Sequence, residues 1–149
     1  MKAFKVLSIV FAILTILIGA GPIMRDTSLV DKINEEMEQI SALSPELANM
    51  AMEQSGLPST GTLYGAMTVS ILVILLAIVG LFMAIKANPK VKLIGLVMIV
   101  LAIVAIILHP SIEMGSTGGA SPRMVAIIHG VPAMLTGLFM FLLAGKIKA

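Results

Sequence analysis

The sequence predicts an all-α integral membrane protein: four transmembrane helices in an up-down bundle, with one or two short amphipathic helices in the first outer loop. Of the 149 residues, 58% are hydrophobic and only 12% are charged, whereas soluble domains are about half apolar and a quarter charged. Four apolar runs approach the length of about 20 residues that a helix needs to cross a bilayer. Lysines and acidic residues also segregate to opposite sides of such a bundle.

The first apolar run, Val6–Ala20, contains only two hydroxyl residues and predicts a transmembrane helix over residues 4–22. A cleaved signal peptide is the alternative, because two lysines precede the run and a charged start with an apolar centre is typical of such peptides. Ile18, however, puts a bulky side chain where a cleavage site before Gly21 needs a small one. We therefore expect the segment to be retained.

The outer segment, residues 23–61, is much more polar. Thr27 or Ser28 is expected to cap a helix whose apolar side recurs at helical spacing, opposite a row of acidic residues. A second helix is expected to start at Ser44-Pro45-Glu46 and to stop at Gly56. The first of these helices either covers the mouth of the bundle or presents a docking surface for a partner, formed by Val30, Ile33, Met37 and Ile40.

Three further apolar runs predict transmembrane helices over residues 62–86, 91–109 and 123–145. The connection Ala87-Asn88-Pro89 is short and polar, so the second and third spans are expected to form an antiparallel hairpin. The whole chain, residues 1–149, then forms a single membrane domain.

The charges predict how the chain crosses the membrane. All eight acidic residues fall on one side of the predicted bundle, and most of the basic residues fall on the other: Lys2, Lys5, Lys86, Lys90, Lys92, Lys146 and Lys148. The chain is expected to lie in the cell (inner) membrane. Because cytoplasmic loops are enriched in lysine and arginine, both termini are expected on the cytoplasmic side, with residues 23–61 and 110–122 on the outer side. This rule also explains the net positive charge of the chain, so the charge does not indicate a nucleic-acid partner.

Small residues predict where the helices pack closely, since transmembrane helices associate at small side chains. One face of the fourth span carries Ala126, Gly130, Ala133, Gly137 and Ala144, and the second span adds Gly80 and Ala84. This groove accepts either another span of the same chain or another subunit, which includes a second copy. Spacing alone leaves both open.

His129 is the ionisable residue expected at membrane depth. It lies beside Pro132, which cannot donate a hydrogen bond to the carbonyl of residue 128, and next to the small-residue groove. Intramembrane ionisable residues are functional candidates. The apolar runs at the centre of these spans, residues 6–20, 63–85, 93–108 and 124–144, hold no Asp, Glu, Lys or Arg, which argues against an autonomous pump or ion-coupled transporter, and no catalytic motif is present.

His109 and His129 permit one cofactor hypothesis. Both approach the outer side of the predicted bundle, so they could bind haem b or, together with Met114 and Met124, a copper ion. The alternative is that His129 is a hydrogen-bonding core residue and His109 an interfacial residue at the end of its helix. Histidine spacing does not decide between the two.

The sequence is most consistent with a non-enzymatic accessory or structural subunit of a larger membrane assembly. An electron-transfer or metal-handling subunit that uses the two histidines is the first alternative, and a small oligomeric channel or carrier is the second. The layout of four spans carries no function by itself.

Overall fold

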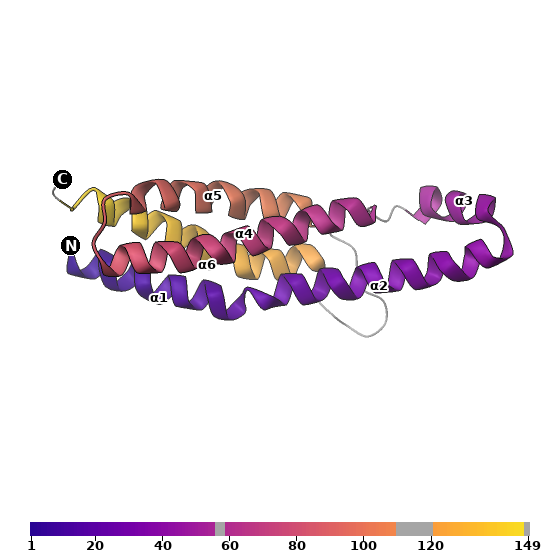
Figure 1. Cartoon of the computed structure of the whole chain (residues 1–149), viewed down its shortest axis with the longest axis horizontal. Helices are drawn as coiled ribbons and strands as arrows, with labels where there is room; N and C mark the ends of the chain where they lie inside the picture. The colour runs from indigo at the N-terminus through magenta and orange to yellow at the C-terminus, as the bar shows by residue number, and fades with distance from the viewer. Residues whose placement is uncertain (56–58, 110–120, 148–149) are drawn as a thin grey trace.

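The computed structural model describes residues 1–55, 59–109 and 121–147 of the chain (Figure 1). This part is helical and contains no strand, which confirms the predicted fold class. Its helices are α1 (Lys2–Ile18), α2 (Ala20–Leu43), α3 (Pro45–Ser55), α4 (Thr60–Ile85), α5 (Val91–Leu108) and α6 (Pro122–Ala144).

Helices α1, α4, α5 and α6 form the predicted bundle (Figure 1). Both α1 and α5 pack against α4 and α6. Among the described residues, four helical segments are long and apolar enough to cross a membrane: the continuous stretch Lys2–Leu43, then Thr60–Ile85, Val91–Leu108 and Pro122–Ala144. The protein is therefore a multi-pass membrane protein by helix length and hydropathy.

The interior of the bundle combines many small side chains with a few large ones such as Met98 and Met140, while many other large apolar side chains face outward. Residues such as Ala12, Ala77 and Ala102 are almost completely buried, whereas Leu17 is 72% exposed and Ile107 is 66% exposed. This arrangement suits a bilayer, because lipid tails solvate large apolar side chains and helices gain most from close contact at small ones.

Helices α5 and α6 make the closest approach in the bundle, at Gly95 and Gly137. A Cβ atom built on Gly137 would lie 2.5 Å from the carbonyl oxygen of Gly95, which no side chain tolerates. The predicted groove on α6 therefore receives another helix of the same chain. Its residues Ala126, Gly130, Ala133 and Gly137 are buried and Ala144 is half-buried, while Gly80 and Ala84 are buried on α4.

Helix α2 continues almost directly from α1 after a break at Gly19 (Figure 1). The N–H of Gly19 donates to Ile16 instead of the carbonyl four residues back, and Pro22, which has no N–H, is accommodated in the first turn of the new helix. The prediction that Thr27 or Ser28 caps this helix is wrong. Both lie inside α2, where the Thr27 hydroxyl donates to the carbonyl of Ile23.

The outer half of α2 extends beyond the bundle, and α3 folds back at its far end (Figure 1). Helix α3 begins at Pro45, as predicted, and ends at Ser55; Gly56 lies outside the described residues. The base of the extension is held by a second apolar cluster, in which Leu29, Val30 and Ile33 of α2 pack against Leu63 of α4.

The turn between α4 and α5 brings these two helices antiparallel, as predicted from Ala87-Asn88-Pro89. Ala87 has a positive φ of 50°, and the side chain of Asn88 accepts a hydrogen bond from the N–H of Lys90. The turn lies at the same end of the bundle as the two chain termini (Figure 1). Six of the seven segregated lysines gather at this end, and Lys148 lies outside the described residues.

Candidate functional site

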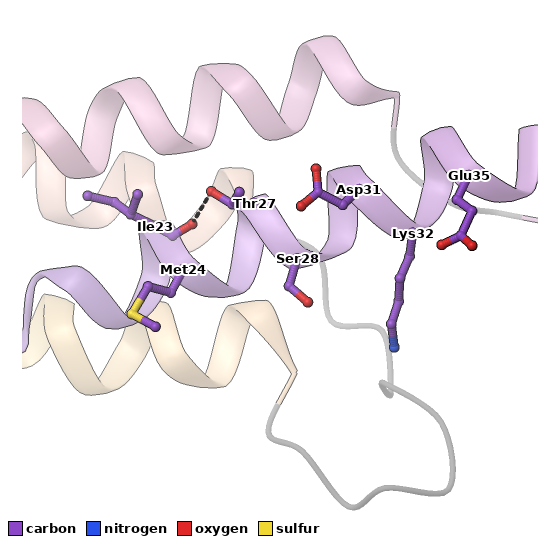
Figure 2. Close-up of a pocket in the computed structure, with 7 residues that line it drawn as sticks. All are labelled: Ile23, Met24, Thr27, Ser28, Asp31, Lys32 and Glu35. Atoms are coloured by element: carbon purple, nitrogen blue, oxygen red, sulfur yellow. Dashed lines mark hydrogen bonds between the residues drawn. The ribbon is translucent and has the colours of Figure 1, made fainter. Parts of the chain in front are cut away.

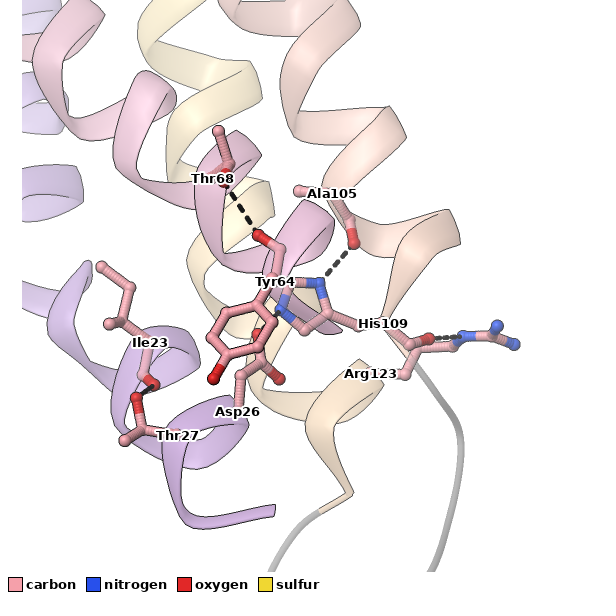
Figure 3. A network of polar contacts seen from close by, with 8 residues as sticks. All are labelled: Ile23, Asp26, Thr27, Tyr64, Thr68, Ala105, His109 and Arg123. Carbon is pink, nitrogen blue, oxygen red and sulfur yellow. Dashed lines mark hydrogen bonds and ion pairs between the residues drawn. The ribbon is translucent and has the colours of Figure 1, made fainter. Parts of the chain in front are cut away.

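A buried aspartate–histidine pair links α2 to the end of α5 (Figure 3). Asp26 projects inward from α2, and His109 directly follows α5. Oδ2 of Asp26 lies 2.6 Å from Nε2 of His109, and both side chains are completely buried. The two residues are 83 positions apart in the chain. The pair therefore joins α2 to the end of α5 through side chains in a position closed to solvent.

The partners of the His109 ring fix the number of protons in the pair. Nδ1 is hydrogen-bonded to the carbonyl of Ala105, and a carbonyl only accepts, so Nδ1 carries a proton. Nε2 faces a carboxylate oxygen, which requires one further proton between the two atoms. With this proton, the pair is either imidazolium and carboxylate or neutral imidazole and carboxylic acid, and its net charge is zero in both forms.

The pKa of His109 reflects this arrangement. Burial disfavours the charged imidazolium and would lower the pKa, but the hydrogen bonds to Asp26 and Ala105 and the negative charge of Asp26 outweigh it. The result is a pKa raised above the ordinary value of 6.5. His109 therefore retains its second proton to a higher pH than an exposed histidine.

Arg123 connects the same site to α6. Its Nε donates to the carbonyl of His109 at 2.9 Å, and its Nη2 lies 3.5 Å from the carbonyl of Ile107. Both carbonyls belong to the last turn of α5 or directly follow it, where no further helical N–H is available to bond them. Arg123, near the start of α6, thereby caps the carbonyl groups at the end of α5.

Two buried side-chain oxygens have no hydrogen-bond partner among the described residues: Oδ1 of Asp26 and Oγ of Ser70. Ser70 lies on α4, which packs against α2. Buried oxygens of this kind are ordinarily bonded to protein or to ordered water. Within the described residues, the only hydrogen bond to the Asp26 carboxylate is therefore the one between Oδ2 and His109.

His129 lies deeper in the bundle and is 4% exposed. Its Nε2 donates to the carbonyl of Thr15 at 3.1 Å, which is the carbonyl that the break at Gly19 leaves without its helical partner. The side-chain hydroxyl of the same Thr15 lies 3.2 Å from the hydroxyl of Thr136. His129 therefore lies in the protein interior, as the sequence predicted for a hydrogen-bonding core residue, and His109 directly follows α5 with its side chain buried.

The described residues proposed as haem b or copper ligands make other contacts or are exposed in this structure. Both ring nitrogens of His109 are engaged in hydrogen bonds, which leaves no free lone pair for a metal. Met124 is 52% exposed on α6, and Met114 lies outside the described residues. Within the described residues, no three His, Cys, Asp or Glu side chains gather in a way that could hold a metal ion.

The predicted docking residues of α2 are only partly available. Val30 and Ile33 are each 3% exposed, because Leu63 of α4 covers them. Met37 and Ile40 are half-buried. The outer helices nonetheless expose other apolar side chains near their tip: Leu43 at 84%, Leu47 at 53% and Met50 at 53%.

A hollow of about 460 Å³ runs along α2 (Figure 2). The described residues that line it all belong to this one helix: Ile23, Met24, Thr27, Ser28, Asp31, Lys32 and Glu35. A cavity that encloses a ligand is ordinarily concave and bounded by several elements. The described side of this hollow is a helix surface and shows no converging set of polar groups.

Sequence reasoning missed Asp26 and Gly95. Ser8, Thr15 and Asp26 share a helical face, because their successive separations of 7 and 11 residues are close to whole numbers of turns. That signal is visible only if the first helix is continued past residue 22. The chain matches no protein-family model, no curated protein and no solved structure.

Proposed function

We propose that the chain is a non-enzymatic, membrane-anchored accessory subunit that binds a partner protein through its outer arm. The outer arm is defined here as residues 27–55, which comprise most of α2 and all of α3. One observation carries the proposal: Leu43, Leu47 and Met50 are exposed at the tip of the arm, in its polar part beyond the apolar bundle (Figure 1). Exposed apolar residues with a polar rim are typical of protein interaction sites.

The charge of the arm indicates the kind of partner. The arm has a single basic residue, Lys32, and its exposed acidic residues are Asp31, Glu35, Glu36, Glu38, Glu46 and Glu53. A second copy would bring acidic surfaces together, and an anionic lipid headgroup would also be repelled. The complementary occupant is a protein with a basic surface around an apolar patch.

The bundle serves as the anchor of the arm. Its small-residue groove is filled by α5 of the same chain, at Gly95 and Gly137, and is therefore not the surface that supports association with other subunits. The lysines around the chain termini favour a cytoplasmic position for that end. The arm would then reach its partner on the outer side of the membrane.

A photo-crosslinking amino acid at position 47 tests the proposal in native membranes. We expect one discrete protein adduct at Leu47 and only lipid adducts when the same amino acid replaces Leu75, which is 52% exposed on the apolar helix α4. The adduct should weaken in the double variant Glu46→Lys, Glu53→Lys, because the charge complementarity is reversed. An adduct that consists of a second copy, of lipid alone, or of a protein whose yield ignores these charges would refute the proposal.

A further inference from the structure

We propose that Asp26 and His109 form a proton-binding site that holds α2 against the end of α5 while the proton is bound and weakens this attachment when it is lost. The ligand is a single exchangeable proton. This inference does not depend on the proposed docking function, because it concerns the bundle end and not the tip of the arm.

The geometry shows why loss of the proton matters. Nδ1 remains protonated, because it donates to the carbonyl of Ala105. Without the shared proton, the lone pair of Nε2 would face the Oδ2 of Asp26 at 2.6 Å. Two acceptors at this separation repel each other, and the pair would carry a buried negative charge.

The second carboxylate oxygen of Asp26 makes the site depend more strongly on the shared proton. Its Oδ1 is buried without a hydrogen-bond partner among the described residues, so the described protein compensates the carboxylate charge through His109. A buried carboxylate that loses its partner is strongly destabilising. Movement of α2 away from α5 is the direct way to hydrate it.

The other charged and titratable groups around the pair make contacts of their own or are exposed. On α6, Arg123 is engaged with the carbonyls of His109 and Ile107, and His129 is bonded to Thr15 one layer deeper. Tyr64 of α4 is 53% exposed. Arg25 precedes Asp26 on α2 and has contacts of its own. Asp31 is exposed further along α2.

The direction of the pH dependence follows from the geometry and from the raised pKa of His109. A group whose pKa is higher in the folded state stabilises that state fully below its unfolded value, near 6.5. This stabilisation disappears as the pH rises through the higher folded value. The attachment of α2 is therefore expected to be firm at mildly acidic pH and weaker on the alkaline side of the His109 titration.

Two measurements on the full-length protein in lipid nanodiscs test the site. The chain has only two histidines, so ¹⁵N-histidine labelling gives two ring signals, which a His129→Gln variant assigns. The chain also has no cysteine, so spin labels on Glu36→Cys and Ile107→Cys report the distance between α2 and α5. We expect His109 to titrate above 6.5 and the distance to lengthen or broaden over the same pH range.

Asp26→Asn should lower the titration midpoint of His109 and remove the change in distance. His109→Gln should also remove the change in distance, and it serves if the first variant does not fold. Asp31→Asn, an exposed change on the same helix, is the matched control and should alter neither measurement. The proposal is overturned if His109 titrates like free histidine, if the distance stays constant through its titration, or if Asp26→Asn retains the pH-dependent change.

Discussion

The side chain of His129 bonds a backbone carbonyl, that of Thr15, at the point where the first helix is broken. The N–H of Gly19 turns to Ile16, so the carbonyl of Thr15 has no helical partner in its own chain segment. The imidazole of His129 supplies the missing donor from α6. In lipid no water is available to take this role, so a histidine side chain completes the hydrogen bonding of a broken helix.

Replacement of His129 by leucine is expected to destabilise the bundle by about 1 kcal/mol, because it leaves the Thr15 carbonyl buried without a donor. His129→Gln should lose less, since its amide also donates. The free energy of unfolding, measured by denaturant titration in detergent micelles, distinguishes the two variants. Equal stability of His129→Leu and the unmodified chain would show that this hydrogen bond contributes nothing.

Sequence reasoning reached His129 but not the Asp26–His109 pair. A histidine beside a proline and a row of small residues is a local pattern, so its position in the interior was predictable. Asp26 pairs with a residue 83 positions away, and no local spacing records that contact. The premise that the first helix ends at residue 22 also put Asp26 in an outer loop, whereas α2 keeps it in helical phase with Thr15 and turned toward the bundle.

At the level of helices, the contact between α5 and α6 is made by two glycines. The groove on α6 was predicted from its repeated small residues, but the matching position on α5 was not, because Gly95 stands alone among large apolar residues. A single glycine carries no repeat, although the structure brings the backbones together there. The helical stretch continues beyond the first predicted span, residues 4–22, because Gly19 and Pro22 interrupt the helix without stopping it.

Gly137→Leu is expected to destabilise the bundle by about 1–3 kcal/mol or more, because its side chain would collide with the backbone of Gly95. Gly65→Leu is the matched control, since a Cβ on Gly65 of α4 meets nothing within 4 Å. Thermal unfolding of both variants in the same detergent measures the difference. If Gly137→Leu were as stable as Gly65→Leu, the close approach of α5 and α6 would not be a determinant of the fold.

Across the whole molecule, charge is divided between the two ends. The end with both termini and the α4–α5 turn carries the lysines, and the outer arm carries the exposed acidic residues (Figure 1). The sequence alone predicted the four spans and this division, because composition and run length dominate the energetics of insertion. It did not predict that the first helix continues past the bundle, since an amphipathic outer segment is equally compatible with a separate helix.

We expect the acidic arm to lie outside the membrane and the lysine-rich end in the cytoplasm. Since the chain has no cysteine, Glu36→Cys and Lys90→Cys each introduce one reactive thiol at an exposed position. A membrane-impermeant maleimide should label Glu36→Cys in intact cells and Lys90→Cys only after permeabilisation. The reverse pattern would invert the orientation, and the cysteine-free chain supplies the background.

The near-continuity of α1 and α2 would make the pair act as a lever, with its fulcrum at Gly19, if the angle between the two helices changed there. The segment Lys2–Leu43 spans 42 residues, and its longer limb, from Gly19 to Leu43, measures about 36 Å at a rise of 1.5 Å per residue. A tilt of about 5° at the fulcrum would carry the tip sideways by about 3 Å over that length. Small rearrangements inside the bilayer would thus be enlarged at the tip, where Leu43 is exposed.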